Sequence, residues 1–224
     1  VDEQDSILLD HTLVVDQGRI VDLLPNIDAP TKYTADRTVD LPKHTLIPGL
    51  INAHAHSPMV LLRGLGDDKP LMDWLTKHIW PAEGDLVTAD FVKEGTELAV
   101  CEMIRTGTTC FAEHYFYPDM TARVASEMGI RSQVGLWVGN VKTPWANDAN
   151  ACITLGKKAY DAFMSDHPDN ALVSFALAPH SPYMVDDKTF HELKKWRDTD
   201  HLRVHIHLHE TAKEVEDSLS AYGK

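Results

Sequence analysis

The chain has 224 residues, of which 43% are hydrophobic and 25% charged, and its formal net charge is −13. This is the composition of an ordinary soluble globular protein, and the length suits one large domain or one domain with part of another. The acidic balance argues against a surface that binds nucleic acid or anionic lipid.

Targeting signals and cysteine usage indicate where in the cell the protein is located. No apolar run approaches the roughly 18 residues that a membrane span needs, and the acidic first twenty residues do not resemble a signal peptide. Cys101, Cys110 and Cys152 are odd in number and lack metal-type spacing, which predicts reduced thiols. We therefore expect a cytoplasmic protein.

Residues 6–47 predict a small β unit. The segments 12–15 and 19–24 flank Asp16-Gln-Gly18, a plausible hairpin turn. Two further extended segments, 38–41 and 45–47, are each followed by a proline that breaks regular structure.

The next stretch carries two histidines. A short apolar run at Leu50 and Ile51 leads into His54-Ala-His56 and stops at Ser57-Pro58. Residues two apart on an extended chain point to the same side, so both imidazoles would project together where the strand ends. By itself this pair is a weak signal, because surface histidines or hydrogen-bonded core histidines share the spacing.

The remainder alternates helices and strands. A short helix is expected over 70–80, ending before Pro81, and a long one from the N-cap Thr88 to Arg105. Candidate strands then end near residues 53, 112, 138, 178 and 208, each followed by a helical segment. This alternation predicts a parallel sheet. A (β/α)8 barrel is favoured over a doubly wound sheet because the sequence contains no Gly-rich phosphate loop. Five units do not close a barrel.

Polar residues cluster just past four of the strand ends. Leu202–Leu208 adds a second histidine group, in which His205, His207 and His209 share one face and Glu210 follows. Histidines that converge from two strand ends favour a bound metal, and an adjacent carboxylate suits a proton carrier for metal-activated water. The alternative is a histidine-rich edge with a solvated glutamate.

Three other positions are candidates on weaker grounds. His180 lies in the rigid loop Pro179-His-Ser-Pro182 and could contact a substrate or be structural. Glu83 follows Trp80-Pro-Ala and could enter the site or be a surface residue at a helix end. Glu113-His114 is expected to support the site or form a packed pair.

Taken in order, these motifs resemble the amidohydrolase superfamily, and within it the deaminases of 5-methylthioadenosine and S-adenosylhomocysteine. The resemblance extends over essentially the whole chain. It rests on the segments 46–56, 61–68, 80–83, 179–182 and 205–211.

The resemblance implies a fold, a cofactor and residue roles. Residues 1–48 would be part of a small β-sandwich domain, and 49–224 the first part of the (β/α)8 barrel. One divalent metal, usually zinc, would be held by His54, His56 and His207. Glu210 would shuttle protons, Glu83 would bind the ribose hydroxyls and His180 would contact the substrate.

Three departures from the family accompany the match, and one is that the closing strands of the small β-sandwich have no counterpart in the 224 residues. The family's sixth-strand histidine and eighth-strand aspartate, the remaining metal ligand, have no counterpart in the 224 residues and are expected beyond Lys224. The segment 136–140 also lacks the arginines that some members use to contact substrate after the third strand.

The expected activity is hydrolytic, metal-dependent deamination of the adenine amine of a nucleoside, namely S-adenosylhomocysteine, 5′-methylthioadenosine or adenosine. The partner would be a small molecule, with no nucleic acid or membrane, and the protein could form a homo-oligomer. The alternatives are a guanine or cytosine deaminase or a triazine hydrolase on the same barrel, or a non-catalytic metal-binding protein.

Overall fold

The computed structural model describes residues 6–223, and its internal contacts divide the chain into two units, Val1–Pro48 and Gly49–Lys224. Among the described residues, no helix combines the length and the apolar character that crossing a membrane requires.

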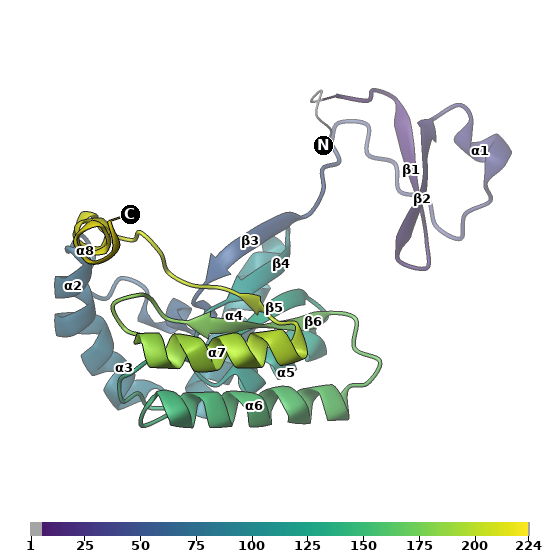
Figure 1. Ribbon diagram of the computed structural model, residues 1–224. Coiled ribbons are helices and arrows are strands. Elements are labelled where there is room, and N and C mark those ends of the chain that lie inside the picture. The colour runs from purple at the N-terminus through teal and green to yellow at the C-terminus, as the bar shows by residue number, and fades with distance from the viewer. Residues whose placement is uncertain (1–5, 224) are drawn as a thin grey trace. The chain divides into compact units, whose positions relative to one another are not determined.

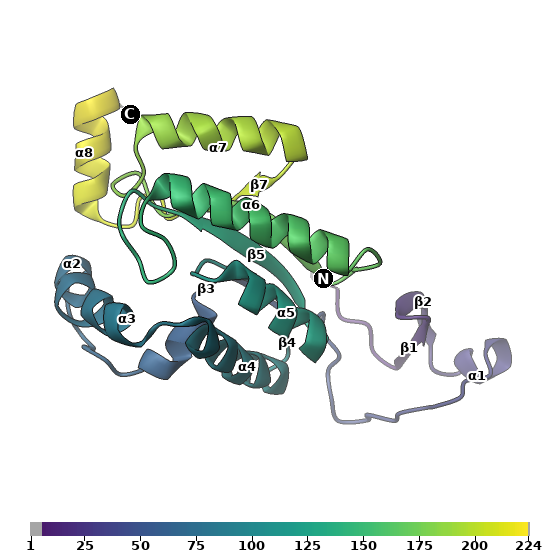
Figure 2. The ribbon, with the colours of Figure 1, turned by 90° about the horizontal axis from the view of Figure 1, so that it is seen from below.

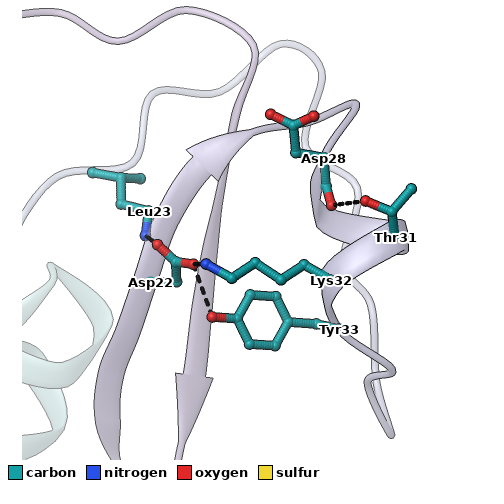
Figure 3. A network of polar contacts seen from close by, with 6 residues as sticks. All are labelled: Asp22, Leu23, Asp28, Thr31, Lys32 and Tyr33. Carbon is teal, nitrogen blue, oxygen red and sulfur yellow. Dashed lines mark hydrogen bonds and ion pairs between the residues drawn. The ribbon is translucent and has the colours of Figure 1, made fainter.

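The first unit is built on an antiparallel hairpin of β1 (His11–Asp16) and β2 (Arg19–Pro25), as predicted (Figure 1). The turn residues Gln17 and Gly18 have φ angles of 50° and 72°, the left-handed pair that a type I′ turn requires. Asp22 ties the short helix α1 (Ala29–Lys32) to the hairpin. Its carboxylate accepts hydrogen bonds from Lys32 Nζ at 2.7 Å and from Tyr33 Oη at 2.8 Å (Figure 3).

The other two β segments predicted in this unit are wrong. Residues 38–41 and 45–47 have no regular structure, and their large apolar side chains are 48–68% exposed. An extended apolar segment becomes a strand only where a neighbour pairs with its backbone. Within residues 6–48, the described strand pairing joins β1 to β2 alone.

The second unit contains a parallel sheet whose five strands follow chain order (Figure 1). They are β3 (Leu50–Ala55), β4 (Thr108–Glu113), β5 (Arg131–Val138), β6 (Val173–Pro179) and β7 (Arg203–Val204). Each neighbouring pair is parallel. A sequential parallel sheet with a helical segment after every strand is the arrangement of a (β/α)8 barrel, and five of its units are present in a curled half-barrel.

Helices connect the strands and cover the sheet. Figure 2 shows α4 (Ala89–Arg105), α5 (Pro118–Met128), α6 (Ala149–Asp166) and α7 (Asp187–Asp200) in chain order across one face. The remaining helical segments are η1 (Ser57–Leu62), α2 (Leu71–Trp74), the π-helical η2 (Leu75–Ile79), α3 (Trp80–Leu86) and α8 (Ala212–Tyr222). Side chains of Thr88, Asp148, Asp186 and Thr211 cap helices by accepting a backbone N–H three residues on.

The core lies between the sheet and these helices. Phe111, Val134, Leu136 and Leu177 have no exposed surface and pack with buried side chains of the covering helices. This burial explains why the strand segments are recognisable in the sequence as short, continuous apolar runs.

In the second unit, two further details differ from the sequence-based expectations, and both concern the site. The helical region does not end before Pro81, because Pro81 occupies the first turn of α3, where no backbone N–H is needed. Glu83 therefore lies on a helix. The last strand is also shorter than 202–208, since regular pairing covers Arg203–Val204 only. His209 adopts a left-handed φ of 56°, which ends the extended alternation and removes it from the predicted shared face.

Candidate metal centre and adjoining cavity

The polar residues of the second unit gather at the C-terminal ends of the parallel strands. His54 is the next-to-last residue of β3 and His56 comes directly after this strand. Glu113 ends β4, and His180 follows β6. Beyond β7 the chain stays aligned with its neighbour, because His205 N donates to Leu177 O at 2.9 Å and His207 N to His180 O at 3.0 Å. That alignment brings His207 to the edge where His54 and His56 lie.

Three imidazole nitrogens meet there at a common point. His54 Nε2 lies 3.2 Å from His56 Nε2 and 3.1 Å from His207 Nε2, and the His56 and His207 Nε2 atoms are 3.2 Å apart. Among the described residues these three histidines form the group that could hold a metal ion. Zinc binds imidazole nitrogen at about 2.0–2.1 Å, which places two tetrahedral ligands roughly 3.3–3.4 Å apart. The triangle is close to that size.

Hydrogen bonds at Nδ1, on the outer side of the rings, indicate which nitrogen of each ring has a free lone pair for a cation. His56 Nδ1 lies 2.6 Å from His114 O, and His207 Nδ1 lies 2.8 Å from His180 O. A carbonyl only accepts, so Nδ1 carries the proton in both neutral rings and both Nε2 atoms present lone pairs. Two lone pairs 3.2 Å apart with no proton between them repel each other unless a cation lies between. The donor set therefore fits a divalent metal such as zinc.

Burial favours the neutral form of the His54 and His56 imidazoles by lowering their pKa values. It lowers the pKa of His56 to about 4, with smaller contributions from neighbouring histidines, and lowers the pKa of His54 as well. The surrounding rings behave in the same way, because burial lowers the pKa of His180 to about 3 and that of His205 to about 4. Neutral imidazole is the form that binds metal ions.

Glu113 supports the turn that carries His56. Its carboxylate is 1% exposed and accepts from Ser57 N at 3.1 and 2.9 Å and from His114 N at 2.9 Å. Burial raises the pKa of Glu113 to about 7. The expectation that Glu113-His114 would support the site or pack as a pair agrees with these contacts.

A cavity of about 450 Å³ adjoins the histidine group. Its polar lining includes five candidate site residues, the neighbouring His114, and Lys142 and Thr143; the candidates are His56, Glu83, His180, His207 and Glu210. Much of the opposite lining is aromatic or apolar, including Met59, Leu71, Trp74, Trp80, Phe116, Trp137 and Met184. Sites with this mixture bind small molecules that have a flat or apolar body and a few polar groups.

Glu83 enters this cavity from α3. It is 7% exposed, and Tyr115 Oη donates to its Oε1 at 2.7 Å. Burial raises the pKa of Glu83 to about 7, although the Tyr115 hydrogen bond acts in the opposite direction. With Oε1 engaged, Oε2 is the oxygen on which a ligand hydroxyl can bind.

Glu210 reaches the cavity from the segment before α8. Tyr183 Oη donates to Glu210 Oε2 at 2.9 Å. The backbone at Glu210 is fixed by Glu214, whose carboxylate accepts from His209 N and Glu210 N, each at 2.9 Å. Glu210 is thus held at one carboxylate oxygen and at its main chain, and Tyr183 leaves its Oε1 unengaged.

The sequence reasoning missed Tyr115, Tyr183 and Glu214. Tyr115 directly follows Glu113-His114 at a strand end, and that position was an available signal. Tyr183 and Glu214 are brought to Glu210 by loop and helix conformation, for which the sequence carried no comparable sign. His205 and His209, counted in the predicted histidine cluster, do not belong to the three-nitrogen group among the described residues.

Comparisons with known proteins agree with this architecture. Residues 45–224 match the amidohydrolase family. A 5-methylthioadenosine/S-adenosylhomocysteine deaminase of Saccharophagus degradans is 40% identical over 217 residues, which is 96% of this chain and 48% of the relative. The chain thus spans about half the length of such curated relatives.

Solved structures give the same picture. The crystal structure of an adenosine deaminase from Xanthomonas campestris with bound zinc has a TM-score of 0.91 and 43% identity, over 98% of this chain and 49% of that one. A guanine deaminase from C. acetobutylicum has a TM-score of 0.80 at 23% identity, over 97% of this chain and 52% of that one, and this likeness concerns the fold alone. With four fifths of its length matched and the barrel's strand-end histidines in place, the chain belongs to the amidohydrolase family.

Proposed function

We propose that the protein is a hydrolytic deaminase that converts the adenine amine of a nucleoside to the inosine form and releases ammonia. Its substrates would be S-adenosylhomocysteine, 5′-methylthioadenosine and adenosine. The observation that carries the proposal is the single cavity in which His56 and His207, two members of the three-nitrogen group, line the same space as Glu83 and Glu210.

In this proposal His54, His56 and His207 hold one divalent ion, most simply zinc. When bound, such an ion lowers the pKa of a water molecule to about 7, so that water becomes a nucleophile at neutral pH. The histidines contribute neutral donors in a fixed orientation, since carbonyl oxygens of His114 and His180 hold two of the rings.

Glu210 would move the protons. Its Oε1 would take one proton of the attacking water and deliver it to the ring nitrogen next to the amine-bearing carbon, as the water oxygen bonds to that carbon. In a second transfer it would carry the remaining proton of the added hydroxyl to the amine, so that the C–N bond breaks, the C=O bond forms and ammonia leaves. Tyr183, donating to Glu210 Oε2, keeps the carboxylate in one orientation through both transfers.

Glu83 and His180 would bind and orient the substrate. The free oxygen of Glu83 accepts hydrogen bonds from ribose hydroxyls, and His180 contacts the purine from the other side of the cavity. Both residues supply orientation and take no part in bond making. The aromatic and methionine lining suits a purine ring and a thioether.

Relatives support this reading. The curated relatives at 35–40% identity are named 5-methylthioadenosine/S-adenosylhomocysteine deaminases, and the neighbour with a TM-score of 0.91 is an adenosine deaminase with bound zinc. On the same grounds we propose that residues 1–48 are part of a small β-sandwich domain and 49–224 the first part of the barrel.

A screen of ammonia release by the zinc-loaded, full-length protein tests the function. We expect turnover of S-adenosylhomocysteine, 5′-methylthioadenosine and adenosine, and at least tenfold lower kcat/KM for guanine, cytosine and a chlorinated triazine. A preference for a free base or a triazine would overturn the proposal in favour of another enzyme of this fold. Stoichiometric zinc without turnover of any of these compounds would instead indicate a metal-binding protein that is not a deaminase.

We further propose a cytoplasmic location, a small-molecule partner and a homo-oligomeric state, with no nucleic-acid or membrane partner. The formal charge of −13 supports the last point. Light scattering after size-exclusion chromatography measures the oligomeric state, and a monomeric mass would contradict it.

A further inference from the structure

His205 is a histidine that the proposed mechanism does not use. It was predicted as a member of the second histidine cluster, yet its Nε2 lies 2.8 Å from His54 Nδ1 and faces away from the three-nitrogen group. The rings of His54 and His205 meet edge to face, with centroids 4.8 Å apart and an interplanar angle of 89°. The two side chains come from opposite edges of the sheet, 151 positions apart in the sequence.

The contact between His54 and His205 is one of three that hold the rings of the three-nitrogen group at Nδ1. Each ring of the three-nitrogen group turns Nε2 inward and engages Nδ1 on its outer side: His56 with His114 O, His207 with His180 O, and His54 with His205 Nε2. A backbone carbonyl can only accept, so it fixes the tautomer of His56 and of His207. The partner of His54 is the exception, because an imidazole nitrogen can accept or donate.

The direction of the hydrogen bond between His54 and His205 follows from the need for a lone pair on His54 Nε2. His54 can present a lone pair at Nε2 only if its Nδ1 carries the proton. His54 then donates, and His205 Nε2 must accept, with the His205 proton on Nδ1. The main chain of His205 is held by its bond to Leu177 O, and its ring lies against the buried His114 at a centroid distance of 5.3 Å. The acceptor therefore has a fixed position.

His54 depends on this acceptor more than its neighbours depend on theirs. It is the exposed member of the group, whereas His56 and His207 are half-buried. Packing thus restrains the His54 ring less, and the hydrogen bond to His205 carries more of its orientation.

We propose that His205 is a positioning residue, which orients the His54 ring, fixes its tautomer and thereby sets the affinity of the group for a divalent metal. Partners on the outer side of metal-binding histidines typically change metal affinity about 10- to 100-fold when they are removed. The inference rests on the proposed metal site but not on the proposed substrate.

The test measures zinc affinity by competition with a chromophoric chelator. We expect His205→Leu, which has no acceptor, to weaken binding about 10- to 100-fold. We expect His205→Gln, whose Oε1 can take the place of Nε2, to stay within about threefold of the parent. His209→Asn is the matched control on the same segment; asparagine tolerates the left-handed backbone found there, and zinc affinity should not change.

Nitrogen-edited NMR of the histidine rings gives a second readout. The parent and His205→Gln should both show a hydrogen-bonded Nδ1–H on His54, and His205→Leu should lose it. If the leucine variant does not fold, His205→Asn, an amide whose shorter side chain withdraws the acceptor, should show the same loss of affinity. Parent-like zinc affinity in the leucine or asparagine variant, or an equal loss in the glutamine variant, would overturn the proposal. A failure of deamination with the affinities as expected would overturn the proposed function alone.

Discussion

The backbone amide of Ser57 donates to both carboxylate oxygens of Glu113, at 3.1 and 2.9 Å. This pair joins the residue that follows His56 to the last residue of β4, and Glu113 also accepts from the amide of His114, whose carbonyl holds the His56 ring. One buried carboxylate thus fixes both the main chain next to His56 and the residue that orients its side chain.

Glu113→Gln should weaken zinc binding and lower stability together. An amide has one acceptor oxygen, so its NH2 group would face a backbone N–H, and a buried donor left unpaired costs about 1–3 kcal/mol. We expect roughly tenfold weaker zinc affinity, since the turn that carries His56 is loosened. Chelator competition and urea unfolding measure the two effects. Glu127→Gln, at an exposed glutamate of α5, is the control, and equal behaviour of the two variants would show that the Ser57 contact is unimportant.

Metal removal should destabilise the second unit. A ligand that binds only the folded state at 100 times its Kd adds about 2.7 kcal/mol of stability. We expect zinc to raise the melting temperature of the chelator-treated protein, and His56→Gln to abolish most of this rise. A zinc-dependent rise of the same size in His56→Gln would place the metal elsewhere.

Glu210→Gln should remove catalysis and spare the metal. A positioned general acid–base contributes about 10²- to 10⁴-fold to the rate, and kcat should fall by that factor at unchanged zinc content. Glu216→Gln, at an exposed position of α8, should keep parent activity. Loss of zinc in Glu210→Gln would assign Glu210 to metal binding.

Glu83→Gln should raise KM for nucleoside substrates and leave the turnover of free bases unchanged. A hydrogen bond to a charged group contributes about 1.5–3 kcal/mol, so KM for nucleosides should rise about 10- to 100-fold while turnover of any free base is unaffected. Tyr115→Phe, which removes the bond that orients Glu83, should give a smaller rise of the same kind. Equal effects of Glu83→Gln on nucleosides and bases would contradict ribose recognition by Glu83.

Glu83 should also make stability depend on pH. Burial raises its pKa from 4.5 to about 7 in the folded protein, so between these values the folded protein keeps a proton that the unfolded chain releases. The contribution of Glu83 is therefore complete below pH 4.5 and is lost as the pH rises to about 7, by at most about 3 kcal/mol.

Paired unfolding experiments isolate this effect. Glu83→Gln cannot ionise, so its stability relative to the parent should increase between pH 5 and pH 8 in urea unfolding. Glu94→Gln, at an exposed glutamate of α4, serves as the control. A stability difference between Glu83→Gln and the parent that is the same at both pH values would contradict a raised pKa.

Much of the fold could be predicted because its strands are buried. Apolar runs around Phe111, Val134 and Leu177, separated by amphipathic helices, carry the alternation directly in the sequence. The failures arise where pairing partners or neighbouring turns decide the structure. Residues 38–47 have the composition of strands but no neighbouring strand in the described part of the chain to pair with. Pro81 lies in the first turn of α3, which directly follows the π-helical segment η2.

The candidate site likewise has features that the sequence predicts and features that it does not. Spacing alone predicted that His54 and His56 project together, because this depends only on the backbone repeat. The outer partners of the rings could not be predicted, since they depend on the register between strands. His205 illustrates the limit: the sequence places it in a histidine repeat, and the positioning role proposed for it rests on the contact with His54 Nδ1, which the sequence does not reveal.

The carbonyl groups that hold His56 and His207 belong to residues 114 and 180, whose side chains line the cavity. Every residue type has a carbonyl, so a substitution at either position changes what the cavity meets and leaves the anchor of the metal-facing ring in place. Main chain and side chain of one residue thus serve separate tasks. The His114 ring also packs against His205, whereas among the described residues the ring contacts of His180 do not include His205. Position 180 is therefore the natural starting point for a change of substrate preference that leaves the histidine group intact.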